Sequence, residues 1–220
     1  MKLHYLTIAT KPHAILENIK KRVLQNGEYI YILGKDENKH IGWHANGNFG
    51  LKIKLVQDFL INNQVDDNEL ILFTDAYDVI YYGDFSTVVD RYNMFNKPIV
   101  FGAETTCSPD PRMIKHYDNI NTKFPFLNSG LYIGKVWALK ECLQNYEYND
   151  KHDDQLFWTQ QFFQHQDKIE LDYNNNLFLN TYGVDSEDIS ITKSAIFYNG
   201  KNPLFLHVNG PDKSDLDKFL

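Results

Sequence analysis

The sequence predicts an α/β fold in which a mostly parallel sheet is flanked by helices. Apolar, β-branched segments alternate with segments whose apolar residues recur at helical spacing, which is the order expected of strand, helix and strand units. The 220 residues, 43% of them hydrophobic, are enough to bury a sizeable core. No internal repeat or linker divides the chain, so we expect a single domain over residues 1–220.

The N-terminal part predicts the opening strand, helix and strand. Residues 2–10 are apolar enough for a first strand, and residues 13–27 show a helical pattern that ends on Asn26-Gly27, a stop signal. The next expected elements are a strand, a polar glycine-containing loop, a helix and a buried strand, at residues 28–34, 35–50, 51–63 and 68–75.

The C-terminal part continues this alternation. A helix is expected at residues 152–164, because the acidic pair Asp153-Asp154 stands at its start and apolar residues follow. The other expected elements are a strand, a loop with a strand and a helix, and a last apolar strand ending in a turn, at residues 97–104, 124–146 and 202–213.

Composition excludes several classes of protein. A formal charge of −7 argues against nucleic acid as a partner, since that binding depends on clustered positive charge. The two cysteines form no CxxC pair, which argues against a thiolate metal site or a disulfide framework. No signal peptide and no membrane span is recognised, so a cytoplasmic location is favoured, in the host cytoplasm if the chain is viral. The oligomeric state stays open.

An apolar run, residues 68–74, ends on two carboxylates, Asp75 and Asp78. Ligands of open α/β sheets bind beyond the carboxyl ends of the strands, so Asp75 stands where a site would form. The two carboxylates can converge only if the chain bends at Ala76-Tyr77. We predict that bend, together with a divalent cation that offsets the desolvation and repulsion of the carboxylates. The alternative is that Asp75 caps a turn and Asp78 is solvated.

His207 is a candidate third ligand. It ends the apolar strand of residues 203–207 and leads directly into the turn of residues 208–213. Two carboxylates and an imidazole, with positions left for phosphate oxygens, suit Mn²⁺ better than an all-oxygen Mg²⁺ site. A single histidine in such a place is more often a structural residue.

Seven segments together resemble one known family. They are TIAT at 7–10, GLKIKLV at 50–56, LFTDAYDVI at 72–80, FGAETTCSPDP at 101–111, FPFLNSGLYIG at 124–134, DDQLFWT at 153–159 and LHVNGPDK at 206–213. In this order, and across nearly the whole chain, they resemble the glycosyltransferase domain of the procollagen lysyl hydroxylases and the related viral and cellular collagen glycosyltransferases.

The resemblance implies a GT-A type, Rossmann-like fold with a mixed, mostly parallel sheet. It implies a UDP-sugar donor bound through a divalent cation, usually manganese. It also implies transfer of the sugar to hydroxylysine or galactosylhydroxylysine in a collagen-like polypeptide. The separate iron-dependent oxygenase domain of the hydroxylases is not expected within these 220 residues.

The resemblance also assigns roles to single residues. Asp75, Asp78 and His207 match the metal ligands of the family. Tyr77 matches the aromatic residue that stacks on uracil, and Thr10 matches a position that contacts the nucleotide through its backbone or its hydroxyl.

Further matches concern the phosphates. Lys52 matches a lysine near the donor, whereas Lys54 is expected on the solvated face of the same helix. Gly210 and Lys213 resemble the pyrophosphate contacts, where glycine allows a close backbone approach and lysine adds a point charge.

On the sugar side, Asp153 and Asp154 match the end of the family's aspartate run. One of them is expected to be structural at the helix start while the other faces the sugar. Asn128 resembles a contact to the donor sugar or the acceptor, although Asn-Ser-Gly is also common turn chemistry. Ser108 stands where the family commonly has tryptophan, and Trp43 is either an aromatic surface over the donor or a hydrophobic anchor.

The predicted function is manganese-dependent transfer of a hexose from a UDP-sugar. In its specific form, glucose moves from UDP-glucose to galactosylhydroxylysine with retention of configuration. Three alternatives stay open: UDP-galactose-dependent transfer to hydroxylysine, phosphate hydrolysis with Asp75 as nucleophile or ligand, and a non-catalytic module that binds nucleotide sugars or glycans.

Overall fold

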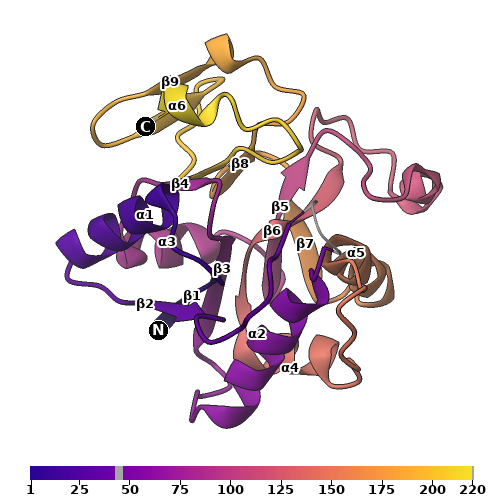
Figure 1. Ribbon diagram of the computed structural model, residues 1–220. Coiled ribbons are helices and arrows are strands. Elements are labelled where there is room, and N and C mark those ends of the chain that lie inside the picture. Colours follow the sequence, from indigo (N-terminus) through magenta and orange to yellow (C-terminus); the bar gives the residue numbers. More distant parts are fainter. Residues whose placement is uncertain (43–46, 220) are drawn as a thin grey trace.

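A six-stranded sheet forms the centre of the fold (Figure 1). The structure, a computed structural model, describes residues 1–42 and 47–219. The strands lie in the order β2-β1-β3-β6-β5-β7, and neighbours are parallel except for the two pairs that include β6. The mixed, mostly parallel sheet predicted from the sequence is therefore confirmed. The strands are β1 (Leu3–Ile8), β2 (Ile30–Leu33), β3 (Leu70–Asp75), β5 (Ile99–Glu104), β6 (Phe126–Lys135) and β7 (Ile169–Asp172).

Helices cover both faces of this sheet. The chain leaves β1 toward β2 on one side and then returns past β1 to β3 on the other. Because such crossovers are right-handed, α1 and α2 lie on opposite faces. Figure 1 shows α1 with α3 on one side, and α2 with α4 and α5 on the other. The helices are α1 (Ala14–Gln25), α2 (Gly50–Asn62), α3 (Phe85–Tyr92), α4 (Val136–Leu143), α5 (Asp154–Gln164) and α6 (Leu216–Phe219), with 3₁₀ turns at Pro111–His116 and Ser186–Asp188.

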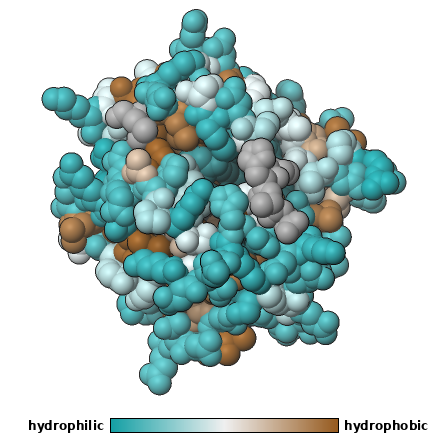
Figure 2. All heavy atoms as spheres, viewed as in Figure 1, coloured by the Kyte–Doolittle hydropathy of each residue, from teal (hydrophilic) through white to brown (hydrophobic). Residues whose placement is uncertain are grey.

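The helix ends follow the local sequence. The first helix stops at Asn26, and Gly27 takes a positive φ of 72°, which confirms the predicted stop signal. In the described ranges of the chain, the helices are all too short or too polar to cross a bilayer. Figure 2 shows a mostly hydrophilic surface on this face, with apolar residues in scattered patches.

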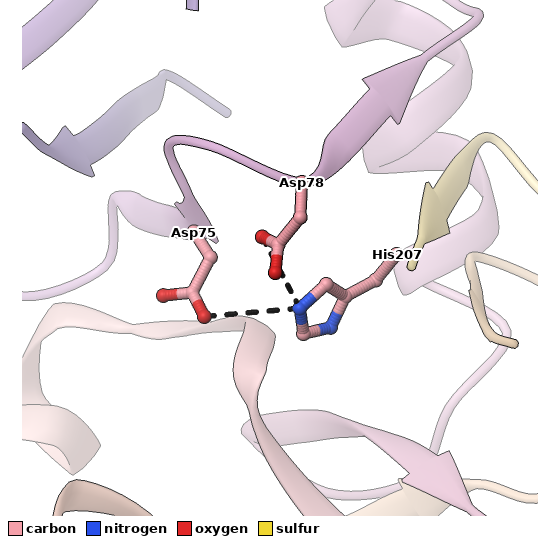
Figure 3. Close-up of side chains that lie close together, drawn as sticks. All are labelled: Asp75, Asp78 and His207. Atoms are coloured by element: carbon pink, nitrogen blue, oxygen red, sulfur yellow. Dashed lines mark ion pairs between the residues drawn. The ribbon is translucent and has the colours of Figure 1, made fainter. Parts of the chain in front are cut away.

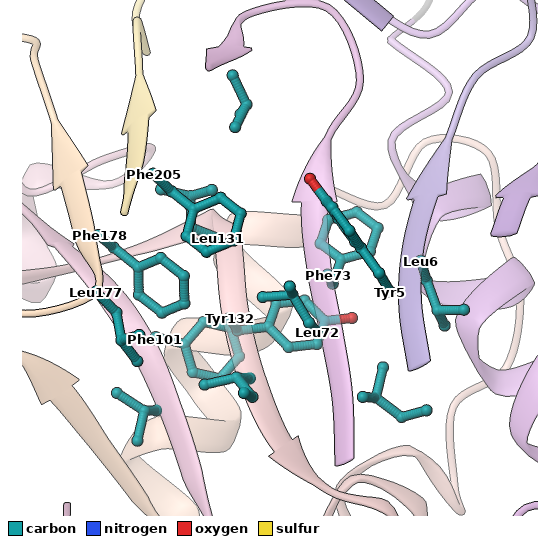
Figure 4. Close-up of a cluster of buried hydrophobic side chains, with 14 of the residues drawn as sticks. Tyr5, Leu6, Leu72, Phe73, Phe101, Leu131, Tyr132, Leu177, Phe178 and Phe205 are labelled. Atoms are coloured by element: carbon teal, nitrogen blue, oxygen red, sulfur yellow. The ribbon is translucent and has the colours of Figure 1, made fainter. Parts of the chain in front are cut away.

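A smaller sheet, in the order β4-β11-β8, packs beside the large one. Its strands are β4 (Val79–Tyr81), β8 (Phe178–Asn180) and β11 (Phe205–His207), and a separate hairpin follows from β9 (Ile189–Ile191) and β10 (Ile196–Tyr198). Aromatic rings join the two sheets. Tyr81 and Phe205 stack at 4.5 Å, and each packs edge-on against Tyr5 of β1. Figure 4 shows Phe205 and Phe178 in the same buried cluster as side chains of the large sheet, such as Tyr5 and Phe73. This packing holds the end of β11 close to the end of β3.

Candidate active site

The site begins at the carboxyl edge of the large sheet, between β1 and β3. The strand order reverses there, which is the position where open α/β sheets bind ligands. Asp75 is the last residue of β3, and the chain bends over residues 76–78 before β4. The bend predicted from the sequence is therefore confirmed, and it turns Asp78 toward the same side as Asp75.

The small sheet adds His207. This residue ends β11, where it pairs with Val79, the residue after Asp78. The N–H of Val208 donates to the backbone oxygen of Asp78 at 2.9 Å, which locks the two segments together. The imidazole Nε2 lies 3.8 Å from Oδ2 of Asp75 and 3.4 Å from Oδ1 of Asp78 (Figure 3). One ligand atom from each residue lies within 4.8 Å of the others.

A hydrogen bond behind the ring orients His207. Its Nδ1 lies 2.8 Å from Oδ1 of Asn180, whose Nδ2 donates to the oxygen of Ala103. Because the Asn180 amide is oriented by that second bond, its oxygen faces Nδ1, and Nδ1 carries the proton. In the neutral ring, the lone pair of Nε2 then points at the two carboxylates. Metal-binding histidines typically have such a hydrogen-bond partner on the ring nitrogen that faces away from the metal.

Gly130 of β6 lies directly beside His207 and Asp75. A Cβ at this position would lie 2.4 Å from Cε1 of His207 and 2.9 Å from Oδ2 of Asp75. Two carboxylates, one oriented imidazole and a space kept free of side chains fit a divalent cation.

Two lysines lie against the cluster. Lys52 of α2 contacts Asp75 at 2.6 Å and Asp154 at 3.0 Å, and Lys213 contacts Asp78 at 2.6 Å. Burial alone would lower the pKa of Lys52, but Asp154 and Asp75 outweigh it and raise that pKa, so the ammonium stays charged. Likewise, burial opposes ionisation of Asp78, but the positive charges of His207 in its protonated form and of Lys213 hold the pKa of Asp78 below its usual value.

The two helix lysines separate as expected. Lys54, two residues after Lys52 and therefore on another face of the helix, pairs with Asp58 on the partly exposed surface of α2. Lys52 instead points into the buried site.

The two adjacent aspartates at the start of α5 also have different partners. Asp153 is the N-cap, and its Oδ1 accepts from the N–H of Leu156 at 2.8 Å. Asp154 is only 6% exposed and accepts from Lys52 and from the hydroxyl of Ser129. One carboxylate therefore caps the helix, and the other turns into the site.

Asn128 lies inside β6, so the turn interpretation of Asn-Ser-Gly is wrong. The pairing of β6 with β5 shifts register between Phe101 and Gly102, and this bulge leaves residues 129–131 without partners on β5. The Asn128 side chain accepts from the N–H of Gly130 at 3.0 Å. Bulges commonly redirect side chains beside active sites, and here the bulge places Ser129 and Gly130 at the cluster.

Thr10 and Tyr77 lie on the β1 side of the cluster. The backbone N–H groups of Thr10 and Lys11 donate to the hydroxyl of Tyr77 at 2.9 and 3.2 Å. The Tyr77 ring also packs against His13, with centroids 5.2 Å apart. The Thr10 backbone thus orients the ring that the resemblance assigns to uracil.

A cleft of about 360 Å³ opens on the other side of the cluster, toward β5. Its lining brings together nine of the residues predicted from the sequence: Lys52, Asp75, Asp78, Asn128, Asp153, Asp154, His207, Gly210 and Lys213. Ser108 lines it as well, in place of the aromatic residue common in the family. Trp43 lies outside the described residues.

Glu104 is a cleft residue to which sequence reasoning gave no role. It ends β5 and accepts from Gln155 at 2.6 Å and from Asn209 at 2.8 Å. Burial raises the pKa of Glu104 to about 7, although these hydrogen bonds oppose the rise. The signal was present, because a carboxylate that ends an apolar strand is also what identified Asp75. Asn180 and Tyr182 were missed too, and no local pattern marks either.

Comparison with known proteins identifies the family of this chain. The profile of the PLOD GT domain matches residues 1–220. The chain belongs to the PLOD GT domain family. It is 32% identical over 182 residues to the multifunctional procollagen lysine hydroxylase and glycosyltransferase of Caenorhabditis elegans, covering 76% of this chain and 25% of that protein. It is 31% identical over 191 residues to protein R699 of Acanthamoeba polyphaga mimivirus, covering 85% of this chain and 41% of that protein. The chain thus spans less than half the length of these relatives.

The fold has a solved counterpart. A glycosyltransferase involved in the glycosylation of the major capsid of PBCV-1 superimposes with a TM-score of 0.54 at 10% identity, covering 99% of this chain and 98% of that one. At such identity the likeness concerns the fold alone, and that fold is of the GT-A type expected from the sequence.

Proposed function

We propose that this member of the PLOD GT domain family is a manganese-dependent hexosyltransferase. It moves glucose from UDP-glucose onto galactosylhydroxylysine of a collagen-like polypeptide, with retention of configuration. One observation carries the proposal: Asp75, Asp78 and His207, from two distant stretches, converge at the edge of the sheet where nucleotides bind in this fold class. Family membership favours transfer over phosphate hydrolysis.

Asp75, Asp78 and His207 are the residues that would hold the cation. When bound, a divalent cation supplies Lewis-acid neutralisation of the charge that develops on the leaving diphosphate. The ammonium groups of Lys52 and Lys213 add positive charge at the same place.

The nucleotide would lie on the β1 side of the cluster. There the Tyr77 ring, held by the N–H groups of Thr10 and Lys11, offers its face to uracil. Gly210, with φ of 85°, brings backbone close to the diphosphate in the turn after β11.

The hexose would lie on the β6 and β5 side. Asp154 and Asn128 orient its hydroxyl groups, and the buried position of Asp154 keeps its carboxylate aimed inward. In the transfer, the bond between the anomeric carbon and the phosphate oxygen breaks, and UDP leaves with the electron pair. The acceptor oxygen bonds to the same face of that carbon, and its proton passes to the departing phosphate oxygen. No side chain is required as a strong base.

Mass spectrometry of collagen-like peptides tests this proposal. Peptides carrying hydroxylysine or galactosylhydroxylysine are incubated with UDP-glucose or UDP-galactose, with and without Mn²⁺. We expect one added hexose only with UDP-glucose, galactosylhydroxylysine and Mn²⁺. Asp75→Asn, Asp78→Asn and His207→Ala should each lower the rate by at least about 100-fold while the circular dichroism spectrum is retained.

A matched control is Asp67→Asn, which removes an exposed carboxylate paired with Lys140 and should transfer at the wild-type rate. Full activity of the three site variants after exhaustive metal removal contradicts the proposal. Phosphate release that does not depend on acceptor contradicts it in favour of hydrolysis, and transfer from UDP-galactose to hydroxylysine would replace the donor and acceptor.

A further inference from the structure

An exposed tyrosine forms part of the cleft wall. Tyr182 follows β8, lines the cleft and is 43% exposed. Its ring packs against the turn after β11, since a Cβ on Gly210 would lie 2.5 Å from Cδ2 of Tyr182. One side of the ring is thus occupied by backbone that has no side chain, and much of the rest is open to solvent.

The backbone of Tyr182 is firmly held. Its N–H donates to Oδ1 of Asn209 at 2.8 Å, and its oxygen accepts from the hydroxyl of Thr105 at 2.7 Å. Asn209 in turn donates to Glu104, which connects the tyrosine to the floor of the cleft. Among the residues that the structure describes, the Tyr182 hydroxyl has no hydrogen-bond partner. A large ring is therefore held in place at the cleft, and its hydroxyl has no partner among the described residues.

The position of the ring separates it from the residues assigned to uracil. Tyr77 and Thr10 lie at the end of β1, whereas Tyr182 is tied to Thr105 at the end of β5. Two strands, β3 and β6, lie between β1 and β5 in the sheet. Tyr182 is thus on the sugar side of the cluster.

The burial of the lining residues distinguishes a position for the donor sugar from a position for the acceptor. Asp154 and Asn128, two polar residues of the lining, are buried and suit the hexose that is transferred. The exposed ring of Tyr182 stands where a second sugar would arrive from solvent. Phe49, the other aromatic residue in the described lining, packs against the hydrophobic core, and position 108 is serine.

We propose that Tyr182 is a specificity-determining residue for the acceptor, whose ring stacks on the apolar face of the acceptor hexose. β-Galactose suits such a surface, because the C–H groups of carbons 3, 4 and 5 lie together on one face and can contact an aromatic ring. This inference rests on the proposed function and adds to it an acceptor subsite.

Kinetics of two variants and one control test the subsite. With UDP-glucose, Mn²⁺ and a galactosylhydroxylysine peptide, Tyr182→Ala should raise the acceptor KM about tenfold, while the donor KM changes less than about twofold. Tyr182→Phe keeps the ring and should stay within about threefold of wild type. Phe197→Ala, which removes an equally exposed ring (43%) outside the cleft, should have no effect. An unchanged acceptor KM in Tyr182→Ala, or equal rises for donor and acceptor, overturns the proposal.

A binding measurement separates the subsite from the proposed function. Methyl β-galactopyranoside is titrated into the protein with UDP and diamagnetic Mg²⁺ in place of Mn²⁺, and its contact is followed by saturation-transfer NMR. Binding by wild type that is lost in Tyr182→Ala sustains the subsite even if no peptide is glucosylated. Absence of binding by wild type, or equal binding by Tyr182→Ala, overturns the subsite whether or not transfer occurs.

Discussion

Replacing Gly130 with alanine is a direct test of the cation cluster. The added methyl carbon would lie 2.4 Å from Cε1 of His207, whereas carbon atoms normally pack at about 3.5–4.0 Å. An overlap of more than about 1 Å must be relieved by movement of the ring or of β6. The ring has little freedom, because His207 is 3% exposed, bonds Asn180 and ends the central strand of the small sheet.

The expected loss follows from this geometry. Displacing the imidazole removes one of three protein ligands, and we expect the affinity for Mn²⁺ to fall about 100-fold, or about 2.7 kcal/mol. Overpacking should also lower the free energy of unfolding by about 1–3 kcal/mol.

The assay is titration of the metal-free protein with Mn²⁺, followed by the electron paramagnetic resonance signal of the free ion. Gly134→Ala is the matched control. It adds the same methyl to the same strand, 3.0 Å from Cγ1 of Ile99 and 3.3 Å from Cγ of Leu139, away from the cluster. It should destabilise the fold by a similar amount and bind Mn²⁺ like wild type. A Gly130→Ala protein that also titrates like wild type would refute the cluster as the cation site.

Four further predictions concern charged side chains. The pKa of Glu104 is raised from 4.5 to about 7, so the native state holds a proton that the unfolded state has released. The free energy of unfolding of the metal-free protein should therefore fall by about 3 kcal/mol as the pH rises from about 4.5 to 7. Urea titrations should show this slope in wild type and its loss in Glu104→Gln, and identical slopes would contradict the assignment. Lys52→Met leaves Asp75 and Asp154 without their ammonium partner and should lower the free energy of unfolding by about 3–5 kcal/mol in the same urea assay. A loss below about 1 kcal/mol would show that the two ion pairs contribute little to stability. Asp153→Ala should cost about 1 kcal/mol of stability through the lost N-cap. Asp154→Asn should lower transfer at least about tenfold while the affinity for UDP stays within about threefold, and equal losses of both would remove its role on the sugar side.

The long elements could be predicted because their signals are local. The helix of residues 14–25 has both apolar periodicity and an Asn-Gly stop, and the strand that ends on Asp75 is an uninterrupted apolar run. The bend after Asp75 could be inferred as well, because a shared ion requires the two carboxylates to converge.

The parts that could not be predicted depend on distant partners. Helix α3 and strand β4 are short, and strand β8 has only three residues, which give no periodicity to recognise. Yet β8 carries Asn180, and its pairing with β11 is what places that amide against His207. The position of Tyr182 in the cleft likewise follows from contacts made far along the chain.

The three-stranded sheet has a consequence for cohesion of the molecule. Its central strand contributes the imidazole, while the carboxylates come from the end of β3 and the bend that follows it. An ion bound by the imidazole and the carboxylates would stabilise the packing of the small sheet on the large one. The ion binds fully only when β11 is in place, so its binding free energy also favours that packing. Removal of the ion should therefore increase local unfolding of the C-terminal region before it affects the large sheet.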